Sequence, residues 1–195
     1  MYKNFIKPIF DWLIALCAFP FFGILWLVVA VAIKIEDGGP VFYMAERIGK
    51  DSKKLLMYKF RSMKVNAENI LNADGSTYNA KDDPRVTKVG RILRETSLDE
   101  TAQLLNILKG EMSLIGPRAS GWDALPTYKE DEIAKMKVRP GITGYTQAYY
   151  RNSISVREKR LYDAWYANHI SFWLDVKIFF KTIVTVFKHD NIYTN

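Results

Sequence analysis

Apolar and polar positions divide the chain into one long uncharged segment and several shorter periodic ones. Residues 12–33 carry no charge and are numerous enough for a helix to cross a bilayer. Short apolar runs at 41–43 and 55–60 predict a β-hairpin that turns around residues 49–52. Near the end, residues 156–168 and 171–187 predict two helices rich in aromatic side chains. The pattern predicts an α+β fold that is mainly α.

The middle of the chain contains less regular patterns. Residues 63–71 predict a helix with weak periodicity, residues 72–84 a mobile surface loop, and residues 125–138 a charged helix that faces solvent. A helix is predicted to begin at Ser97, because Ser97 and Glu100 have the spacing of a capping box and an apolar run follows. Gly110 fits its left-handed end.

The uncharged segment can be placed in a membrane in two ways. It is too long for a cleaved signal peptide, and no small-x-small cleavage site follows it. Pro20 lies near its middle and kinks a helix. Basic residues flank both ends, so the positive-inside rule gives no polarity; they are Lys3, Lys7 and Lys34. A bent helix that returns to the same face, with Trp12 and Trp26 near headgroup level, and a single span both fit these residues.

Composition limits the chemistry. The net charge of +7 indicates an anionic partner, which can be nucleic acid, anionic lipid or a phosphorylated substrate. Cys17 is the only cysteine, so no disulfide framework is expected, and with only His169 and His189 a zinc site is not expected either. For the aromatic helix at 171–187, we favour a place in the membrane interface over a core position.

The candidate chemistry lies at Asp99 and Glu100. Both fall in the first turn of the predicted helix, where the dipole favours an ionised carboxylate. Such residues ordinarily only stabilise a helix, but an ionised aspartate beside a second carboxylate can also attack phosphorus or hold a divalent metal. Basic residues recur on both sides of the pair, and a stiff turn ends in one of them; they are Lys59, Arg61, Arg85, Lys88, Arg91, Arg94, Arg118 and Arg139. The combination indicates a site for an anionic, metal-bound substrate such as a nucleotide diphosphate.

Several motifs follow one another in a recognisable order. They are Lys59-Phe60-Arg61-Ser62-Met63, Asp83-Pro84-Arg85-Val86-Thr87, Gly90-Arg91-Ile92-Leu93-Arg94, Ser97-Leu98-Asp99-Glu100, Gly110-Glu111-Met112-Ser113-Leu114-Ile115-Gly116-Pro117-Arg118 and Val138-Arg139-Pro140-Gly141-Ile142-Thr143-Gly144. Together they resemble the bacterial sugar transferases, the monotopic phosphoglycosyl transferases that begin glycoconjugate assembly. The chain resembles their minimal form.

The resemblance implies a topology. Residues 1–36 would form a re-entrant membrane helix broken at Pro20, and residues 37–195 a membrane-associated catalytic domain. The catalytic domain would consist of the hairpin, a catalytic helix and amphipathic interfacial helices. The protein would contact membrane lipids on the cytoplasmic face of the bacterial inner (plasma) membrane.

The resemblance also implies an activity. Asp99 would attack the β-phosphate of a UDP-sugar, release UMP and form an aspartyl-phosphosugar intermediate. A polyprenol phosphate (undecaprenyl phosphate) would then accept the phosphosugar. Asp99 and Glu100 would hold Mg²⁺, or Glu100 would assist the acceptor. Arg94 and Arg118 would bind phosphate, with Lys59 and Arg139 as helpers.

Two other classes of protein share some of these features. A non-catalytic, membrane-anchored basic protein that binds anionic lipid is the alternative. A nucleic-acid-binding protein is disfavoured by the uncharged N-terminal segment, so we expect no nucleic-acid partner. An oligomer is compatible with the sequence, which does not specify the sugar or the role of residues 72–82.

Overall fold

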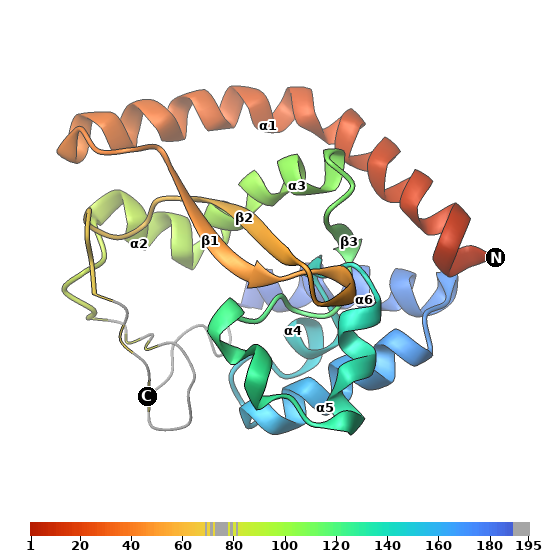
Figure 1. The fold of residues 1–195 in the computed structure, drawn as a ribbon. Helices are drawn as coiled ribbons and strands as arrows, with labels where there is room; N and C mark the ends of the chain where they lie inside the picture. Colours follow the sequence, from red (N-terminus) through yellow and green to blue (C-terminus); the bar gives the residue numbers. More distant parts are fainter. Residues whose placement is uncertain (69, 71, 73–77, 79, 81, 189–195) are drawn as a thin grey trace.

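A single long helix, α1 (Lys7–Asp37), lies along one edge of a mainly helical molecule (Figure 1). The computed structural model describes residues 1–68, 70, 72, 78, 80 and 82–188. A π-helical turn (Tyr2–Ile6) precedes α1, and Gly38 ends it with a φ of +68°. The segment Tyr2–Asp37 is long and apolar enough to cross a membrane by length and composition.

Pro20 does not interrupt α1. The helix is continuous from Lys7 to Asp37 with Pro20 inside it, and it bends along its length (Figure 1). A proline removes one backbone hydrogen bond and pushes against the preceding turn, so a bend without a break is a sufficient response. The expectation of a helix broken at this residue was therefore wrong, while a bent helix is what the structure contains.

The predicted hairpin is present and is longer than its apolar runs. Strands β1 (Phe42–Ile48) and β2 (Lys54–Phe60) pair antiparallel, with Phe42 opposite Phe60 and Ile48 opposite Lys54. The turn contains a short 3-10 helix (Lys50–Ser52). Residues on one face of the hairpin, Ala45, Leu55 and Met57 among them, are buried against α1 and α3.

The segment after the hairpin differs from its prediction. Residues 63–68 form a bridge, a turn and irregular chain rather than a helix, and residues 69 and 71 lie outside the described part. Most of the loop predicted for 72–84, namely 73–77, 79 and 81, also lies outside it. Helix α2 (Lys88–Glu95) follows, capped by the Thr87 side chain, which accepts a hydrogen bond from the Gly90 amide at 2.9 Å.

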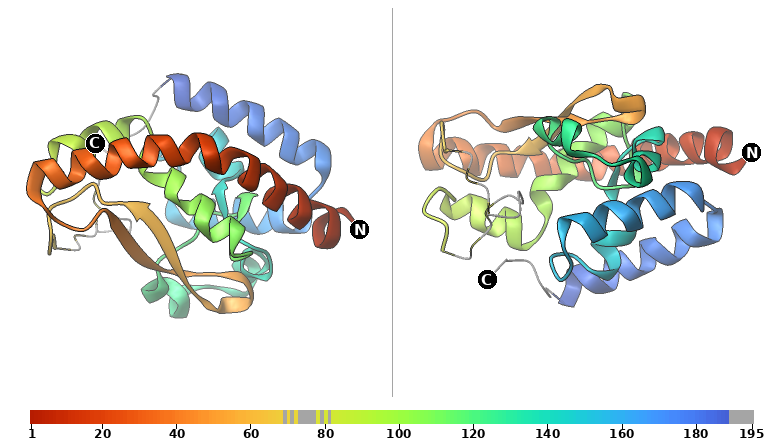
Figure 2. Two further views of the ribbon diagram at one scale, coloured as in Figure 1. Left: turned by 90° about the horizontal axis from the view of Figure 1, so that it is seen from above. Right: turned by 60° about the horizontal axis from the view of Figure 1, so that its bottom comes forward.

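The second half of the chain packs under the hairpin. After the 3-10 helix η3 (Leu98–Gln103) and α3 (Leu104–Leu108), strand β3 (Ser113–Ile115) pairs parallel with β4 (Gly141–Thr143). Between them lie the 3-10 helices η4 (Trp122–Thr127) and η5 (Glu130–Lys137). Helices α4 (Tyr145–Tyr149), α5 (Val156–Asn168) and α6 (Phe172–Lys188) complete the fold (Figure 2). The two terminal helices begin and end within one residue of their predicted bounds.

The predicted charged helix at 125–138 was wrong in both shape and exposure. Two short 3-10 helices occupy this range, and Glu132 and Lys135 within it are buried. Glu132 pairs with Arg157 at 2.6 Å, and Lys135 pairs with Asp163 at 3.0 Å. Charges that sequence alone assigns to solvent are buried here because partners on α5 neutralise them.

Trp26 joins the apolar helix α1 to the rest of the core. Its side chain is buried against Phe60 and Phe42, and its Nε1 donates a hydrogen bond to Thr101 Oγ1 at 3.2 Å. The suggestion that Trp12 and Trp26 lie near headgroup level stays a prediction; Trp12 is exposed, whereas Trp26 is packed inside the protein. One face of α1 thus packs directly on η3, the element that carries Asp99 and Glu100.

Candidate active site

The acidic pair lies on η3, immediately after a sharp reversal of the chain. Helix α2 ends at Glu95, and Ser97 takes a left-handed conformation with a φ of +58° before η3 begins. The Ser97 side chain makes no capping bond; instead its carbonyl accepts a hydrogen bond from the Glu100 amide at 3.3 Å. The predicted capping box is absent because this backbone turn already closes the first turn of η3. Gly110 does adopt the predicted left-handed conformation after α3, with a φ of +75°.

Two cations from distant segments meet the pair. Lys59 Nζ, from β2, lies 2.7 Å from Glu100 Oε1 and 3.7 Å from Asp99 Oδ2. Arg118 Nη2, from the turn after β3, lies 3.2 Å from the same Glu100 oxygen. The fold therefore brings together four of the residues predicted from sequence, although they are spread over about 60 positions.

The two carboxyl groups have opposite pKa shifts. Burial raises the pKa of Asp99, and the Glu100 charge adds to it, while Lys59 opposes the rise. Burial would also raise the pKa of Glu100, but Lys59 and Arg118 outweigh it and hold that pKa at about 2. Glu100 is thus a fixed anion that anchors two cations, and Asp99 is the carboxyl whose protonation responds to its surroundings.

The other two predicted phosphate binders lie in different places. Arg94 is in the last turn of α2, and its positive charge acts on the Asp99 carboxyl. Arg139 does not line this cluster: its Nη2 lies 3.8 Å from where a Cβ on Gly110 would be, and it lines a separate cavity. The structure therefore places Arg94 within electrostatic reach of the acidic pair and Arg139 at a second location.

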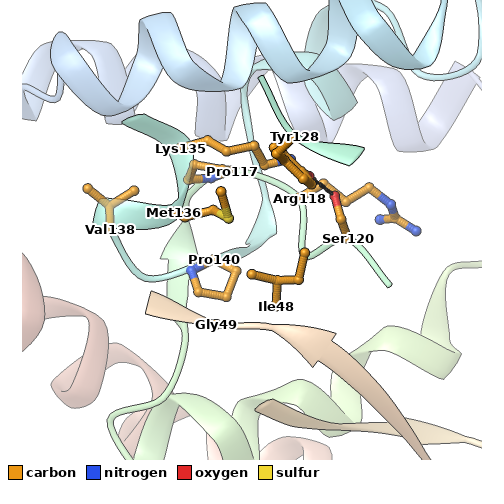
Figure 3. A pocket seen from close by; sticks show the side chains of 10 residues that line it. All are labelled: Ile48, Gly49, Pro117, Arg118, Ser120, Tyr128, Lys135, Met136, Val138 and Pro140. Carbon is orange, nitrogen blue, oxygen red and sulfur yellow. Dashed lines mark hydrogen bonds between the residues drawn. The ribbon is translucent and has the colours of Figure 1, made fainter. Parts of the chain in front are cut away.

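The turn that presents Arg118 is held by buried polar contacts. The Asp163 carboxylate accepts hydrogen bonds from the Arg118 amide at 3.3 Å, from Lys135 Nζ at 3.0 Å and from Thr146 Oγ1 at 2.9 Å. Figure 3 shows Pro117 and Arg118 around one pocket with Ile48 at the end of β1 and the η5 residues Lys135 and Met136. A buried carboxylate with three donors holds its partners firmly, so Asp163 fixes the position of the Arg118 backbone.

Arg47 on β1 is a neighbour that the sequence prediction missed. Within the described residues its Nε is buried without a hydrogen-bond partner. Burial and the nearby Arg118 charge lower the pKa of Arg47, while Tyr43, Asp123 and Glu100 oppose the fall. A single arginine in a strand gives no sequence signal. In the fold, Arg47 forms an antiparallel β-bridge with Gly121, and this bridge brings it beside the turn that carries Arg118. Arg47 thus adds a second guanidinium group beside Arg118, and guanidinium groups suit an anionic ligand.

The donor set limits which metal can bind. Among the described residues no group of three or more histidine, cysteine, aspartate or glutamate side chains lies close together. Mg²⁺ is usually held by one or two carboxylates, with substrate phosphates and water as its other ligands. Asp99 and Glu100, as adjacent carboxylates in a cationic cluster, fit that kind of site, in which the substrate supplies the remaining oxygens.

The comparison with known proteins agrees with this geometry. Residues 2–189 match the family model for bacterial sugar transferases. The undecaprenyl-phosphate galactose phosphotransferase of Salmonella typhimurium is 37% identical over 98% of this chain and 42% of its own length. The UDP-N-acetylgalactosamine-undecaprenyl-phosphate N-acetylgalactosaminephosphotransferase of Aeromonas hydrophila is 40% identical over 93% of this chain and 44% of its own length. This chain thus spans less than half the length of either relative.

A shorter relative matches over most of its length. The exopolysaccharide production protein ExoY of Rhizobium meliloti is 39% identical over 92% of this chain and 84% of its own length. The family match covers the apolar helix, the hairpin, η3 and the Arg118 turn, so it includes every element that builds the acidic and basic cluster. The chain belongs to the bacterial sugar transferase family.

Proposed function

We propose that this protein transfers a phosphosugar from a UDP-sugar to undecaprenyl phosphate and releases UMP. Two of the relatives, those from Salmonella typhimurium and Aeromonas hydrophila, act, by their names, on undecaprenyl phosphate with a galactose or N-acetylgalactosamine phosphate group. The observation that carries the proposal is the pair of buried Asp99 and half-buried Glu100, with Lys59 and Arg118 bonded to Glu100. Such a cluster can receive a diphosphate and offers it a carboxylate nucleophile.

The reaction would proceed in two displacements at one phosphorus. An Asp99 carboxylate oxygen attacks the β-phosphorus, a new P–O bond forms, and the bond from that phosphorus to the bridging oxygen breaks, so that UMP leaves with the electron pair. The phosphate oxygen of the polyprenol phosphate then attacks the same phosphorus and releases the Asp99 carboxylate. Because each step exchanges one P–O bond for another, the mechanism requires no oxidant or reductant.

The cations of the site would make the first displacement feasible. A carboxylate and a diphosphate repel each other, and fixed cations reduce that repulsion before the reacting atoms meet. Arg118 and Arg94 would bind the phosphates, and Arg47 would add a third guanidinium from the hairpin. Lys59 would favour the ionised form of Asp99 through its charge, as it does in the free protein. Mg²⁺, held by Asp99 and Glu100, would neutralise further charge on the diphosphate.

The contacts of α1 support a monotopic arrangement. Near its start, Lys7 pairs with Asp175 of α6 at 2.8 Å, and at its end Asp37 accepts a hydrogen bond from Arg61 Nη1 at 2.6 Å. Both ends of the helix are thus bound to the same catalytic body. A helix that crossed the bilayer would have its two ends on opposite sides of the membrane, so only one end could contact that body. We propose that α1 re-enters the cytoplasmic leaflet, with the exposed apolar faces of α1 and α6 in the lipid.

UMP release from a panel of UDP-sugars tests the activity. The wild-type protein should release UMP from at least one of them when undecaprenyl phosphate is present. Asp99→Asn should lower the rate by about 10³-fold or more, because the nucleophile is lost. Asp82→Asn, which changes an exposed aspartate, is the matched control and should leave the rate unchanged. A wild-type protein that releases no UMP, yet binds anionic vesicles, would favour the scaffold alternative.

Labelling from outside the cell tests the topology. In a Cys17→Ala background, Asn4→Cys places a single thiol at the start of the chain. An impermeant maleimide added to intact cells should leave this cysteine unmodified and should label it once the cells are opened. Labelling in intact cells would show that α1 spans the membrane.

A further inference from the structure

A second cavity, of about 140 Å³, lies at the start of α1. Its walls come from the first turns of α1, the hairpin turn at Lys50, strand β3, residues 137–139 and Tyr166 of α5. Lys59, Asp99, Glu100 and Arg118 do not line it. The cavity is therefore enclosed by several converging segments and is separate from the candidate active site.

The walls of this cavity are strongly basic. Five of its lining side chains are cationic, and they are Lys3, Lys7, Lys50, Lys137 and Arg139. Lys7 is bonded to Asp175 at 2.8 Å, and Lys3 donates to the Ala167 carbonyl at 2.8 Å. For Lys50, Lys137 and Arg139, no side-chain hydrogen bond or ion pair is formed with any residue that the structure describes. Three cations are thus free to receive a ligand.

The cavity contains little negative charge to balance these cations. Among the residues that the structure describes, Asp11 is the only carboxyl group that lines it. That carboxylate already accepts a hydrogen bond from Ser113 Oγ and lies 3.7 Å from Lys7 Nζ. Burial also raises the pKa of Asp11, although Lys7 opposes the rise. Cations on concave walls concentrate a positive potential, so the cavity attracts anions.

We propose that this cavity binds the phosphate of an anionic membrane-lipid headgroup. Arginine and lysine together are the usual protein donors to phosphate. A lipid is favoured as the source of the phosphate because the π-helical turn and the first turn of α1 also carry exposed apolar side chains: Phe5, Ile9 and Phe10 are 68%, 60% and 52% exposed. If this apolar surface is immersed in the lipid, the basic cavity at its edge is at the depth of the headgroups. This step rests on the proposed membrane association.

Arg139 has a phosphate-binding role in this proposal. This arginine resembles a phosphate binder in sequence, yet the structure keeps it apart from the Asp99–Glu100 pair. In the cavity, Arg139 and Lys137 form one wall and Lys50 of the hairpin turn another. A phosphate held between them would link the hairpin to the start of α1 and would fix how deep the catalytic body lies.

Titration calorimetry in a nonionic detergent tests the proposal on the full chain. The probes are short-chain phosphatidylglycerol, short-chain phosphatidylcholine and inorganic phosphate. Phosphatidylglycerol should bind, and Lys137→Gln combined with Arg139→Gln should weaken it by about 30-fold, because two charges near the headgroup are lost. Lys50→Gln, from the hairpin turn, should weaken it by about fivefold. Lys88→Gln with Arg91→Gln, an exposed pair on α2, is the matched control and should change the affinity less than twofold.

Three outcomes would overturn the proposal. Equal affinity in the Lys137/Arg139 variant and the wild type would show that these cations hold no phosphate. Equal binding of phosphatidylcholine would show that the net charge of the headgroup is not recognised. Inorganic phosphate that binds as tightly as the lipid and displaces it would assign the cavity to soluble phosphate. Since the readout is binding, UMP release can fail or succeed independently of it.

Discussion

Replacement of Lys59 by methionine should move the acidic limb of the pH–rate profile upward. Asp99 must be ionised to attack phosphorus, and its pKa is already raised by burial. Lys59 Nζ, 3.7 Å from Asp99 Oδ2, opposes that rise. Without it the pKa of Asp99 rises further, so a larger fraction is protonated and inactive at a given pH. Activity is thus lost at low pH first and returns as the pH increases.

The size of the shift follows from the geometry. Two unit charges at this separation interact by about 4 kcal/mol at an effective dielectric constant of about 20. Two effects reduce the figure: Glu100 holds the same ammonium at 2.7 Å, and the Lys59 side chain is 17% exposed. We expect a net shift of about one pH unit, or ~1.4 kcal/mol.

The assay is kcat/KM for UMP release as a function of pH, followed on the acidic side until activity is lost. Lys59→Arg keeps the charge and should keep most of the wild-type profile. Lys54→Met removes the ammonium of an exposed pair with Glu46 on the same hairpin, and it should change neither the limb nor the plateau. A Lys59→Met profile that is lower at every pH but not displaced would refute the electrostatic role and leave Lys59 only a binding role.

Three further perturbations test the buried contacts, the packing and the metal on which the proposed site depends. Asp163→Asn should lower the free energy of unfolding by about 3 kcal/mol, because buried Lys135 loses its partner, and thermal denaturation measures this. Gly90→Ala should prevent stable folding or strongly lower the melting temperature, since a Cβ there would lie 2.0 Å from the Ser62 carbonyl oxygen; an unchanged melting temperature would contradict the packing described. Chelation with EDTA should abolish UMP release, and Mg²⁺ should restore it; activity that persists after chelation would remove the metal from the proposal.

Local sequence patterns were sufficient for the regular elements. The hairpin and helices α5 and α6 follow from short apolar runs and from periodicity, which depend only on neighbouring residues. Gly110 was predictable for the same reason, because the end of a helix favours a residue that tolerates positive φ. These features are set by local backbone preferences and by which face is apolar.

Tertiary contacts decided the features that the sequence misplaced. Glu132 and Lys135 belong to a charged stretch, and nothing local shows that Arg157 and Asp163 will bury them. Ser97 has the spacing of a cap, but the reversal after α2 gives its backbone that role.

The acidic pair was found from sequence, whereas part of its surroundings was not. Lys59, Arg118 and the pair itself carry motif signals, and the fold brings them within hydrogen-bonding distance. Arg47 has no such signal, because its importance depends on the pairing of β1 with the Arg118 turn. Arg139 has a motif signal but lies elsewhere, since the chain after η5 passes the start of α1. Which cations face one carboxylate is a property of the fold rather than of sequence spacing.

The central claim is that Asp99 becomes covalently bonded to phosphorus, and mass spectrometry of the protein mixed with UDP-sugar alone tests it most directly. The sample is quenched in acid within seconds and digested with trypsin, which releases Asp99 in the peptide 95–109. The account predicts that this peptide gains the mass of one phosphosugar, that UMP appears in a matching single burst, and that added undecaprenyl phosphate removes the adduct. An unmodified peptide, together with UMP release that requires the lipid acceptor from the start, would contradict the account.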